Sequence, residues 1–486
     1  MAMKGLREWI TQLDRAGELK RIAAQVDWNL ELAEVARQST GGPALLFENI
    51  KDHQNTISTR LFINGLNSAR RMCMMLGLGK ETTYPELVSA IKERMKHPIE
   101  PEMVDTGPVK ENVIKGDDID LLQFPVPKWH PLDGGRYIDT FAGTVTADPE
   151  TGELNVGVYR GMVAGKNKIS KLLQPAQHWG IHYQKYKQLN REMPVAVVCG
   201  ADDILLFAGG SPFTHPPDEY SIACGLKQEP IGLVKCETND LFVPAEAEFV
   251  LEGRVSTDPS TFMTEGPFGE WTGYYGWSRK RPVIQVDCIT HRNDPILRGA
   301  IAESGQGVVS ETAFMSNVSI SALVLDHLEK AGVPGVLDLR MRSGPLVVKI
   351  QKLFAGHARQ VAAAIFGAWI SKEFLSWVIV VDDDIDIRDM NEINRSIRDR
   401  MDPKDDIVVF PGMGGSTLYP SAPRELKDEL KYGATPQNKV LFDATIDWVK
   451  HPIREEYGGR RFPPPSTEMS PEIMDLVKRR WKEYGF

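Results

Sequence analysis

The spacing of apolar residues changes along the chain, and the first spacing is helical. In residues 5–20 the apolar positions lie three or four apart, as on one face of a helix. Apolar runs of strand length follow at 44–47 and 61–63, and a second helical stretch covers about 83–96. This alternation predicts a small α/β domain. The prolines that mark a linker after it are Pro98, Pro101 and Pro108.

Short β-rich runs, separated by Gly, Pro and Asp, fill residues 120–300. Many short strands with frequent turn signals favour a β-barrel or sandwich over a parallel sheet. A long helix is then predicted over about 311–331, because its apolar residues keep a helical period and Gly332 and Pro334 end it.

The last part of the chain returns to alternating elements. Strand 346–350, helix 356–370 and strand 378–381 predict a βαβ unit with parallel strands. Near the C-terminus, Ser470-Pro471 begins a helix with one apolar stripe. The stripe favours packing against the helix's own domain, and oligomerisation is the alternative.

Length and composition narrow the class of protein. The 486 residues are enough for two or three domains, and 42% hydrophobic with 25% charged residues is ordinary for a globular protein. A formal charge of -9 gives no basic surface for phosphates, so nucleic acid and anionic membrane surfaces are not expected partners. The five cysteines are scattered without CxxC spacing, which indicates reduced thiols. Without a signal sequence or an apolar run of eighteen residues, a cytoplasmic protein is expected.

The stretch Asn155-Val156-Gly157-Val158-Tyr159-Arg160 is predicted to be a hairpin strand after the acidic turn at 148–153. Asn155 and Arg160 are five positions apart, so a flat strand sends them to opposite faces. They share a site only if the strand twists or bulges, and Gly157 is the expected place for a bulge. The alternative is an ordinary half-buried strand.

A second stretch favours a functional role for Arg160 over an ordinary strand. In Glu265-Gly266-Pro267-Phe268-Gly269-Glu270, two carboxylates bracket a Gly-Pro-x-Gly turn that fixes their relative placement. A pair of acids needs one cation to keep one of them ionised while the other holds a proton. Arg160 is the candidate for that cation.

Other polar residues give weaker signals. His178 and Glu219 stand in loop-like contexts, where a single His or Glu is more often structural or solvated than a ligand. Together with Asn155 they have no compact metal-ligand spacing. The acids at 382–386 follow a strand, which favours solvated loop residues over a cation site.

The chain resembles the UbiD-type decarboxylases, which use prenylated FMN. The motifs that carry the resemblance are "DGGRY" (133–137), "NVGVYR" (155–160), "GKNKI" (165–169), "KC" with "NDLFVPAEAEFVLEG" (235–253), "EGPFGEWTGYY" (265–275), "AGHARQV" (355–361), "VIVVDDDID" (378–386) and "RMDP" (400–403). They run over almost the whole chain. The implied fold is α+β: an N-terminal α/β domain (1–118), a split β-barrel resembling flavin reductases (119–308), a linking helix (309–332) and a C-terminal α/β domain with a C-terminal helix (333–486).

The resemblance also implies a set of ligands. Asn155, His178 and Glu219 correspond to the family's ligands of a divalent metal, usually Mn²⁺, that bridges to the cofactor phosphate. The implied ligands of a monovalent cation, usually K⁺, are Val156, Ala208, Gly209, Ser211 and Glu219. The implied contacts of prenylated FMN are Asn155, Val156, Gly157, Val158, Tyr159, Arg160, Gln177, His178 and Glu219. Many relatives carry a lysine where this chain has Ser376, and Lys372 is the candidate to replace its cofactor contact.

The implied reaction is a reversible decarboxylation. By resemblance, Arg160 and Glu265 position the substrate carboxylate and Glu270 is the proton donor. The family's substrates are aromatic, heteroaromatic or α,β-unsaturated acids, with CO₂ or bicarbonate as the other reactant, and aromatic side chains in the barrel favour a flat ring. A UbiX-type flavin prenyltransferase is expected to supply the cofactor, and a homodimer or homohexamer is the expected assembly.

Two other readings of the same residues are a metal-dependent hydrolase that uses the carboxylate pair and a non-catalytic flavin-binding protein. The first would be active with metal alone. The second would tolerate Glu270→Gln, and it has no use for an acid pair bridged by a cation.

Overall fold

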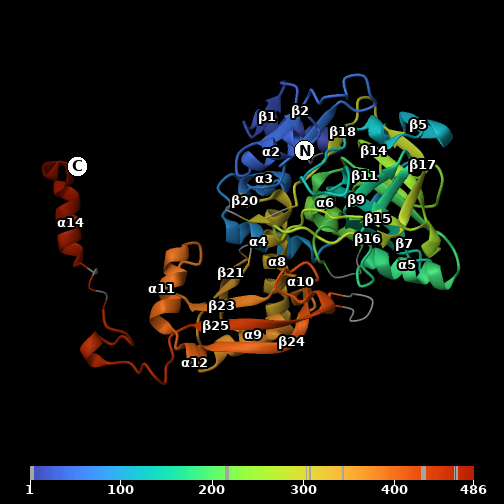
Figure 1. The fold of residues 1–486 in the computed structure, drawn as a ribbon. Helices are drawn as coiled ribbons and strands as arrows, with labels where there is room; N and C mark the ends of the chain where they lie inside the picture. The colour runs from blue at the N-terminus through green and yellow to red at the C-terminus, as the bar shows by residue number, and fades with distance from the viewer. Residues whose placement is uncertain are drawn as a thin grey trace.

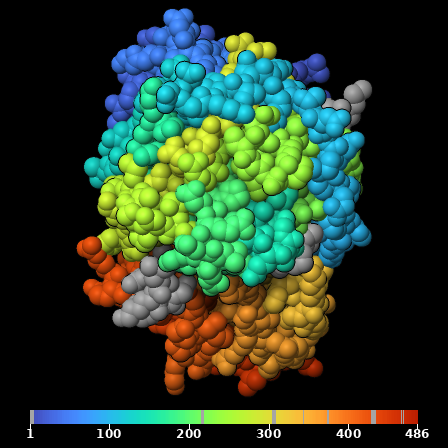
Figure 2. Space-filling model, turned by 90° about the vertical axis from the view of Figure 1, so that its right-hand side faces the viewer, coloured from blue at the N-terminus to red at the C-terminus, as the bar shows by residue number. Residues whose placement is uncertain are grey.

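The structure of the chain is a computed structural model that describes residues 5–213, 218–302, 304–305, 308–341, 344–427, 434–464, 466 and 469–485. The N-terminal residues lie above the central barrel, and the C-terminal domain lies beneath both (Figure 1). Figure 2 shows the same order from another side, with the central residues covering the middle and the C-terminal domain below.

The N-terminal part is a four-stranded sheet with helices, as its alternating pattern predicts. Its strands in spatial order are β1 (Leu19–Ile22), β2 (Ala44–Phe47), β3 (Arg60–Ile63) and β18 (Ile296–Arg298). Its helices are α1 (Gly5–Arg15), α2 (Glu31–Gln38), α3 (Ala69–Met75) and α4 (Tyr84–Arg94). The apolar face of α1 is buried, which explains its helical period.

The central part is one curled antiparallel sheet of nine strands. Their spatial order is β6 (Tyr137–Asp139), β9 (Gly161–Gly165), β10 (Lys168–Lys171), β17 (Val283–His291), β14 (Phe249–Val255), β11 (Met193–Cys199), β7 (Ala142–Ala147) and β8 (Leu154–Val158), and β5 (Asn112–Lys115) also pairs with β17. Its helices are α5 (His178–Gln188), α6 (Asp203–Gly209) and α7 (Glu219–Lys227). The smaller strands are β4 (Glu102–Met103), β12 (Gly232–Lys235) and β13 (Phe242–Pro244), then β15 (Met263–Glu265) with β16 (Arg279–Arg281), and β19 (Ser304–Gly305) with β20 (Val308–Val309).

The helix α8 (Glu311–Lys330) leads from the barrel into a five-stranded sheet. The strands of that sheet in spatial order are β21 (Val336–Met341), β22 (Leu346–Ile350), β23 (Trp377–Asp382), β25 (Thr435–Ala444) and β24 (Ile407–Gly415). Its helices are α9 (His357–Gly367), α10 (Ser371–Phe374), α11 (Met390–Arg400) and α12 (Pro403–Asp406). Strands β22 and β23 are parallel and joined through α9, which confirms the predicted βαβ unit. The predicted α+β fold is thus present.

Helix α8 joins two hydrophobic cores. Met315 and Val318 lie in a core that the N-terminal part shares with the barrel, whereas Val324 and Leu328 lie in the separate core of the C-terminal domain. The C-terminal domain therefore has its own buried interior, and α8 fixes where it stands against the barrel.

Strand pairing crosses the predicted domain boundaries twice. Strand β5 precedes residue 119, yet it pairs with β17 of the barrel. Strand β18 precedes residue 308, yet it pairs in parallel with β3 of the N-terminal sheet. Both exchanges are between segments far apart in the sequence, and local patterns carry no information about them.

The expected bulge at Gly157 is wrong. Strand β8 pairs with β7 from Leu154 to Val158 in one unbroken register. The chain leaves the strand after Val158, so Tyr159 and Arg160 lie in the link to β9. Because Arg160 lies outside the strand, its side chain does not follow the alternation of strand side chains between the two faces, and no bulge is needed.

The C-terminal helix does not pack on its own domain, which corrects the expectation. Helix α14 (Pro471–Arg480) has no buried residue, and it stands away from the body of the molecule at the end of an extended arm (Figure 1). Ile473 is 44% exposed and Trp481 is 51% exposed. The apolar stripe is present, and the described part of the chain leaves it exposed.

Two further expectations concern cysteine and membrane. All five cysteines are free and buried, as predicted. Among the described residues, none of the helices has the length and apolar character needed to cross a lipid bilayer.

Candidate active site

The link between β8 and β9 places Arg160 at the opening of the barrel. Strand β8 ends one side of the curled sheet, and β9 lies next to its other end. The residues that join them therefore cross the split between the two sides. Gly157 supports this course, because a Cβ there would lie 2.2 Å from the Tyr159 ring. That ring also stacks on Trp179 at 5.1 Å between centroids.

Arg160 holds the two predicted acids together. Its Nε donates to Oε1 of Glu265 and its Nη2 donates to Oε2, each at 2.9 Å. Its Nη1 contacts Oε1 of Glu270 in a second ion pair. The Glu265 carboxylate has no exposure to solvent, and the side chains of Arg160 and Glu270 are only 8% and 9% exposed. In such a site an ion pair is screened far less than at the surface.

Glu219 contacts both β8, at the residue after Asn155, and His178. Oε2 of Glu219 accepts a hydrogen bond from the Val156 amide at 2.8 Å, and its Oε1 lies 3.9 Å from Nδ1 of His178. His178 and Glu219 each stand at the first position of a helix, α5 and α7.

The Asn155 amide supports a metal at this place. It is buried, and neither its oxygen nor its nitrogen has a hydrogen-bond partner among the described residues. An unpaired buried polar group costs about 1–3 kcal/mol, so a ligand is expected at the amide. One amide oxygen, one imidazole nitrogen and one carboxylate suit a divalent ion such as Mn²⁺.

The residues predicted for a monovalent cation gather where α6 ends against β8. A Cβ at Gly209 would lie 2.8 Å from the Val156 carbonyl oxygen, so only glycine permits this approach. The Ala208 carbonyl accepts from the Ser211 amide at 3.2 Å, and the Ser211 hydroxyl donates to Phe207. Backbone oxygens of this kind are hard ligands that suit an alkali or alkaline-earth cation.

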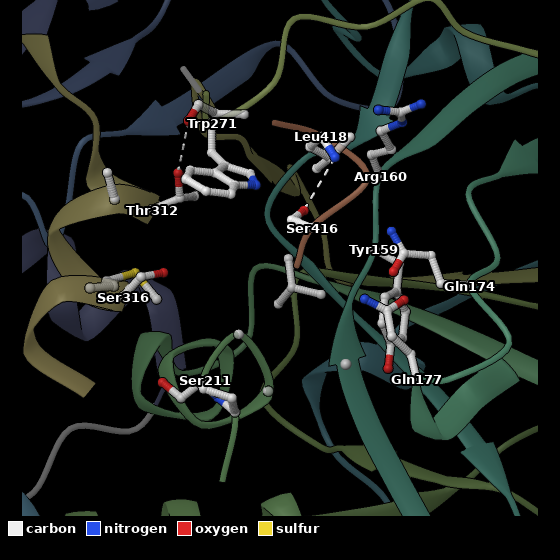
Figure 3. A pocket seen from close by; sticks show the side chains of 18 of the residues that line it. Tyr159, Arg160, Gln174, Gln177, Ser211, Trp271, Thr312, Ser316, Ser416 and Leu418 are labelled. Atoms are coloured by element: carbon white, nitrogen blue, oxygen red, sulfur yellow. Dashed lines mark hydrogen bonds between the residues drawn. The ribbon is translucent and has the colours of Figure 1, made fainter. Parts of the chain in front are cut away.

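One cavity of about 870 Å³ joins these groups. Every predicted cofactor contact lines it, including Gln177, His178 and Lys372. The Lys372 ammonium lies 4.7 Å from the centre of the Trp369 ring. Figure 3 shows Arg160, Tyr159 and Gln177 on one side of the cavity and Thr312 and Ser316 of α8 on the other.

The opposite wall comes from α8, the C-terminal domain and Trp271 of the acid-bearing loop, and the sequence patterns did not predict it. Its lining residues include Trp271, Thr312, Ser316, Met341, Ser416 and Leu418. Trp271 follows Glu270 directly, and its ring meets Tyr419 of the C-terminal domain edge-on at 5.4 Å. Its position beside the acid was the one available signal.

Tyr137 is a second residue that sequence reasoning did not single out, although it belongs to the "DGGRY" motif. Its hydroxyl donates to Oε1 of Glu265 at 2.9 Å. The Arg160–Glu265 pair is thus held from a third side.

Comparison with known proteins places the chain in a family. Family models of the N-terminal, Rift-related and C-terminal domains of 3-octaprenyl-4-hydroxybenzoate carboxy-lyase match residues 10–91, 102–305 and 313–444. The chain belongs to the UbiD family. It is therefore a carboxy-lyase, as the motifs predict.

Full-length relatives agree with this assignment. An uncharacterized protein of Archaeoglobus fulgidus is 32% identical, with 99% of each chain covered. The UbiD-class enzyme HmfF of Pelotomaculum thermopropionicum, in an evolved dimeric form with prFMN, is 28% identical with a TM-score of 0.78, covering 91% of this chain and 95% of its own. The vanillic acid decarboxylase of Sedimentibacter hydroxybenzoicus in closed form is 25% identical with a TM-score of 0.83, covering 100% and 99%.

Proposed function

We propose that this UbiD-family enzyme is a reversible, non-oxidative decarboxylase of an aromatic or heteroaromatic acid that uses prenylated FMN, with α,β-unsaturated acids as the alternative substrates. The observation that carries the proposal is the buried Arg160, shared between two carboxylates at the wall of a large cavity. HmfF, with which this chain aligns over most of its length, was solved with prFMN.

Three side chains would divide the work. Arg160 lines the cavity, with its Nε and Nη2 engaged with Glu265, and its guanidinium would bind the substrate carboxylate there. Glu265 keeps the guanidinium in that orientation. Glu270 lines the cavity and delivers a proton to the carbon that CO₂ leaves, and in the carboxylation direction it removes that proton. When bound, prenylated FMN would supply the acceptor for the electron pair released with CO₂.

The same residues would hold the cofactor. Asn155, His178 and Glu219 would bind Mn²⁺ next to the cofactor phosphate, and the unpaired amide of Asn155 supports this role. Val156, Ala208, Gly209, Ser211 and Glu219 would bind K⁺. Lys372 lies at the cavity wall, where its charge would favour an anionic group.

A flat substrate fits the walls that remain. Trp271 and Phe268 contribute aromatic surface near Glu270, and Leu418 contributes aliphatic surface from the C-terminal domain. Aromatic side chains favour stacking with a ring over contact with an aliphatic chain. Thr312, Ser316 and Ser416 add hydroxyl groups to the same cavity, which would suit polar substituents on the ring.

We further propose that the enzyme is a homodimer or homohexamer and that a UbiX-type prenyltransferase supplies its cofactor. The exposed apolar stripe of α14 supports an assembly, because apolar side chains gathered on an exposed face mark an interaction surface.

The test is to produce the enzyme together with a flavin prenyltransferase and to measure CO₂ release from a panel of aromatic, heteroaromatic and unsaturated acids. Mass spectrometry of the released ligand establishes whether prenylated FMN is bound. We expect turnover of at least one aromatic acid by the loaded enzyme only. Full activity with plain FMN, or with Mn²⁺ and no flavin, would overturn the proposal and favour metal-dependent hydrolysis or another chemistry.

A further inference from the structure

The loop before β6 is closed onto the acid-bearing turn by backbone contacts. The Gly134 amide donates to the Pro267 carbonyl at 2.8 Å, and the Gly269 amide donates to Oδ1 of Asp133 at 3.1 Å. A Cβ at Gly134 would lie 2.2 Å from the Gly266 carbonyl oxygen, so the two segments could not approach this closely with another residue there. This packing brings the first residue of β6, Tyr137, against Glu265.

Tyr137 and Glu265 are both fully buried. The Tyr137 hydroxyl lies 2.9 Å from Oε1 of Glu265 and 3.3 Å from the Pro267 carbonyl oxygen. A hydroxyl donates one proton at a time, and the charged, nearer carboxylate is the stronger acceptor. We propose that Tyr137 is a positioning residue for the reaction: by donating to Glu265 it keeps that carboxylate ionised, so that the proton of the acid pair resides on Glu270.

Glu265 has more hydrogen-bond donors around it than Glu270, as this role of Tyr137 requires. Glu265 accepts from Nε and Nη2 of Arg160 and from Tyr137, which gives its two oxygens three donors. Among the described residues, Glu270 has one such side-chain contact, with Nη1 of Arg160. Hydrogen bonds to a carboxylate stabilise its charged form, and Glu265 receives three of them.

The phenol keeps its proton under working conditions. Burial, together with the charge of Glu265, raises the pKa of Tyr137. Tyr137 therefore remains a donor over the pH range in which carboxylates titrate.

Other charged groups near Glu265 already have partners. Asp133 accepts from His130 and Gly269, and Arg279, opposite Glu265 on β16, donates to the Lys427 carbonyl. Lys171 on β10 is paired with Asp139. Among the described residues, Arg160 and Tyr137 are the side chains that hydrogen-bond to the Glu265 carboxylate.

The test is the pH profile of the Tyr137→Phe holoenzyme, and it rests on the proposed function. Without the hydroxyl, Glu265 binds a proton at higher pH, so activity begins to fall at a higher pH on the acidic side. We expect that side of the kcat/KM profile to move up by about one pH unit, a tenfold loss at low pH that recovers as the pH rises. If the kcat/KM of Tyr137→Phe falls at the same acidic pH as that of the wild type, the proposal is overturned, whether or not kcat is lower at every pH.

A matched control is Tyr183→Phe. Tyr183 is also buried, but its hydroxyl donates to the Ser256 carbonyl rather than to a carboxylate. This variant is expected to keep the wild-type profile. If Tyr137→Phe does not fold, 3-fluorotyrosine at position 137 decides: its more acidic hydroxyl should move the acidic side to lower pH, and an unmoved profile refutes the role.

Infrared titration gives a reading that needs no turnover. The carboxylic acid band that Glu265→Gln removes should appear at higher pH in Tyr137→Phe than in the wild-type protein, and its appearance at the same pH refutes the role of Tyr137. If the wild-type holoenzyme decarboxylates no acid, the proposed function fails while this titration still tests Tyr137. If the wild type is active and neither measurement responds, only the role of Tyr137 fails.

Discussion

Arg160→Lys should remove most turnover although it keeps the positive charge. Arg160 makes two hydrogen bonds to Glu265, each of 2.9 Å, and an ion pair with Glu270. A lysine ammonium cannot make the paired contact with one carboxylate and also reach the second. Losing two of these contacts, each worth about 1.5–3 kcal/mol for a charged group, removes at least about 3 kcal/mol. That corresponds to a loss of about 10²-fold in kcat/KM.

The assay is CO₂ release by the loaded enzyme, with flavin content measured on the same sample so that lost cofactor is not mistaken for lost chemistry. Arg254→Lys is the control, because Arg254 pairs with Glu192 and Asp287 at the surface with its side chain 47% exposed, where a salt bridge contributes little. It should behave as wild type. An Arg160→Lys enzyme with normal flavin content and kcat/KM within threefold of wild type would refute the reasoning.

Three further predictions follow from other parts of the chain. His178→Ala removes a metal ligand, so metal binding should weaken by at least the roughly 10- to 100-fold that is seen when a residue supporting a ligand is changed. The Mn²⁺ and flavin content should therefore fall, and unchanged content contradicts the ligand assignment. Burial lowers the pKa of His53 from 6.5 to about 4, so the unfolded chain binds a proton first and the free energy of unfolding should decline as the pH falls from 6.5 toward 4. Denaturation of His53→Gln should show a weaker decline, and an equal one contradicts the assignment. A chain ending at residue 464 should lose its oligomeric mass by light scattering, whereas an unchanged mass would show that α14 is not in the interface.

The local patterns predicted elements well where each segment buries a face of its own. The first helix, the long helix before the C-terminal domain and the βαβ unit are all present. Their periods reflect burial against neighbours that the same domain supplies. The pairing of β5 with β17 and of β18 with β3 was not predicted, because these partners lie far apart in the sequence. The C-terminal helix was wrongly expected to pack on its own domain, since an apolar stripe does not reveal which surface covers it.

The acid pair shows how much of the site can be predicted from the spacing of residues alone. The Gly-Pro-x-Gly turn indicated that Glu265 and Glu270 would be held together, and Arg160 does join them. The reason given for Arg160 was wrong, because the strand ends at Val158 instead of bulging at Gly157. Where a strand ends in a split barrel depends on how the sheet closes, and that is a property of the whole domain.

The ligand set shows the opposite case. Asn155, His178 and Glu219 share no spacing, and only the family resemblance joined them, yet the fold places His178 and Glu219 at two helix starts beside β8. Tyr137 lies within a recognised motif, but no separate role was predicted for its side chain. A tyrosine that donates to a buried carboxylate looks the same in sequence as one that fills a core.

The central claim is that Glu270 delivers the proton in a decarboxylation that depends on the bound flavin, and one measurement tests it most directly. It is the exchange of the product's hydrogen with deuterated solvent, at the carbon that carried the carboxylate, by wild-type and Glu270→Gln holoenzymes of equal flavin content. The amide is nearly isosteric, so fold and cofactor should be retained while exchange falls by roughly 10²-fold or more, the range for a positioned acid. Exchange at the wild-type rate in Glu270→Gln would contradict the claim and make Glu265 the next candidate.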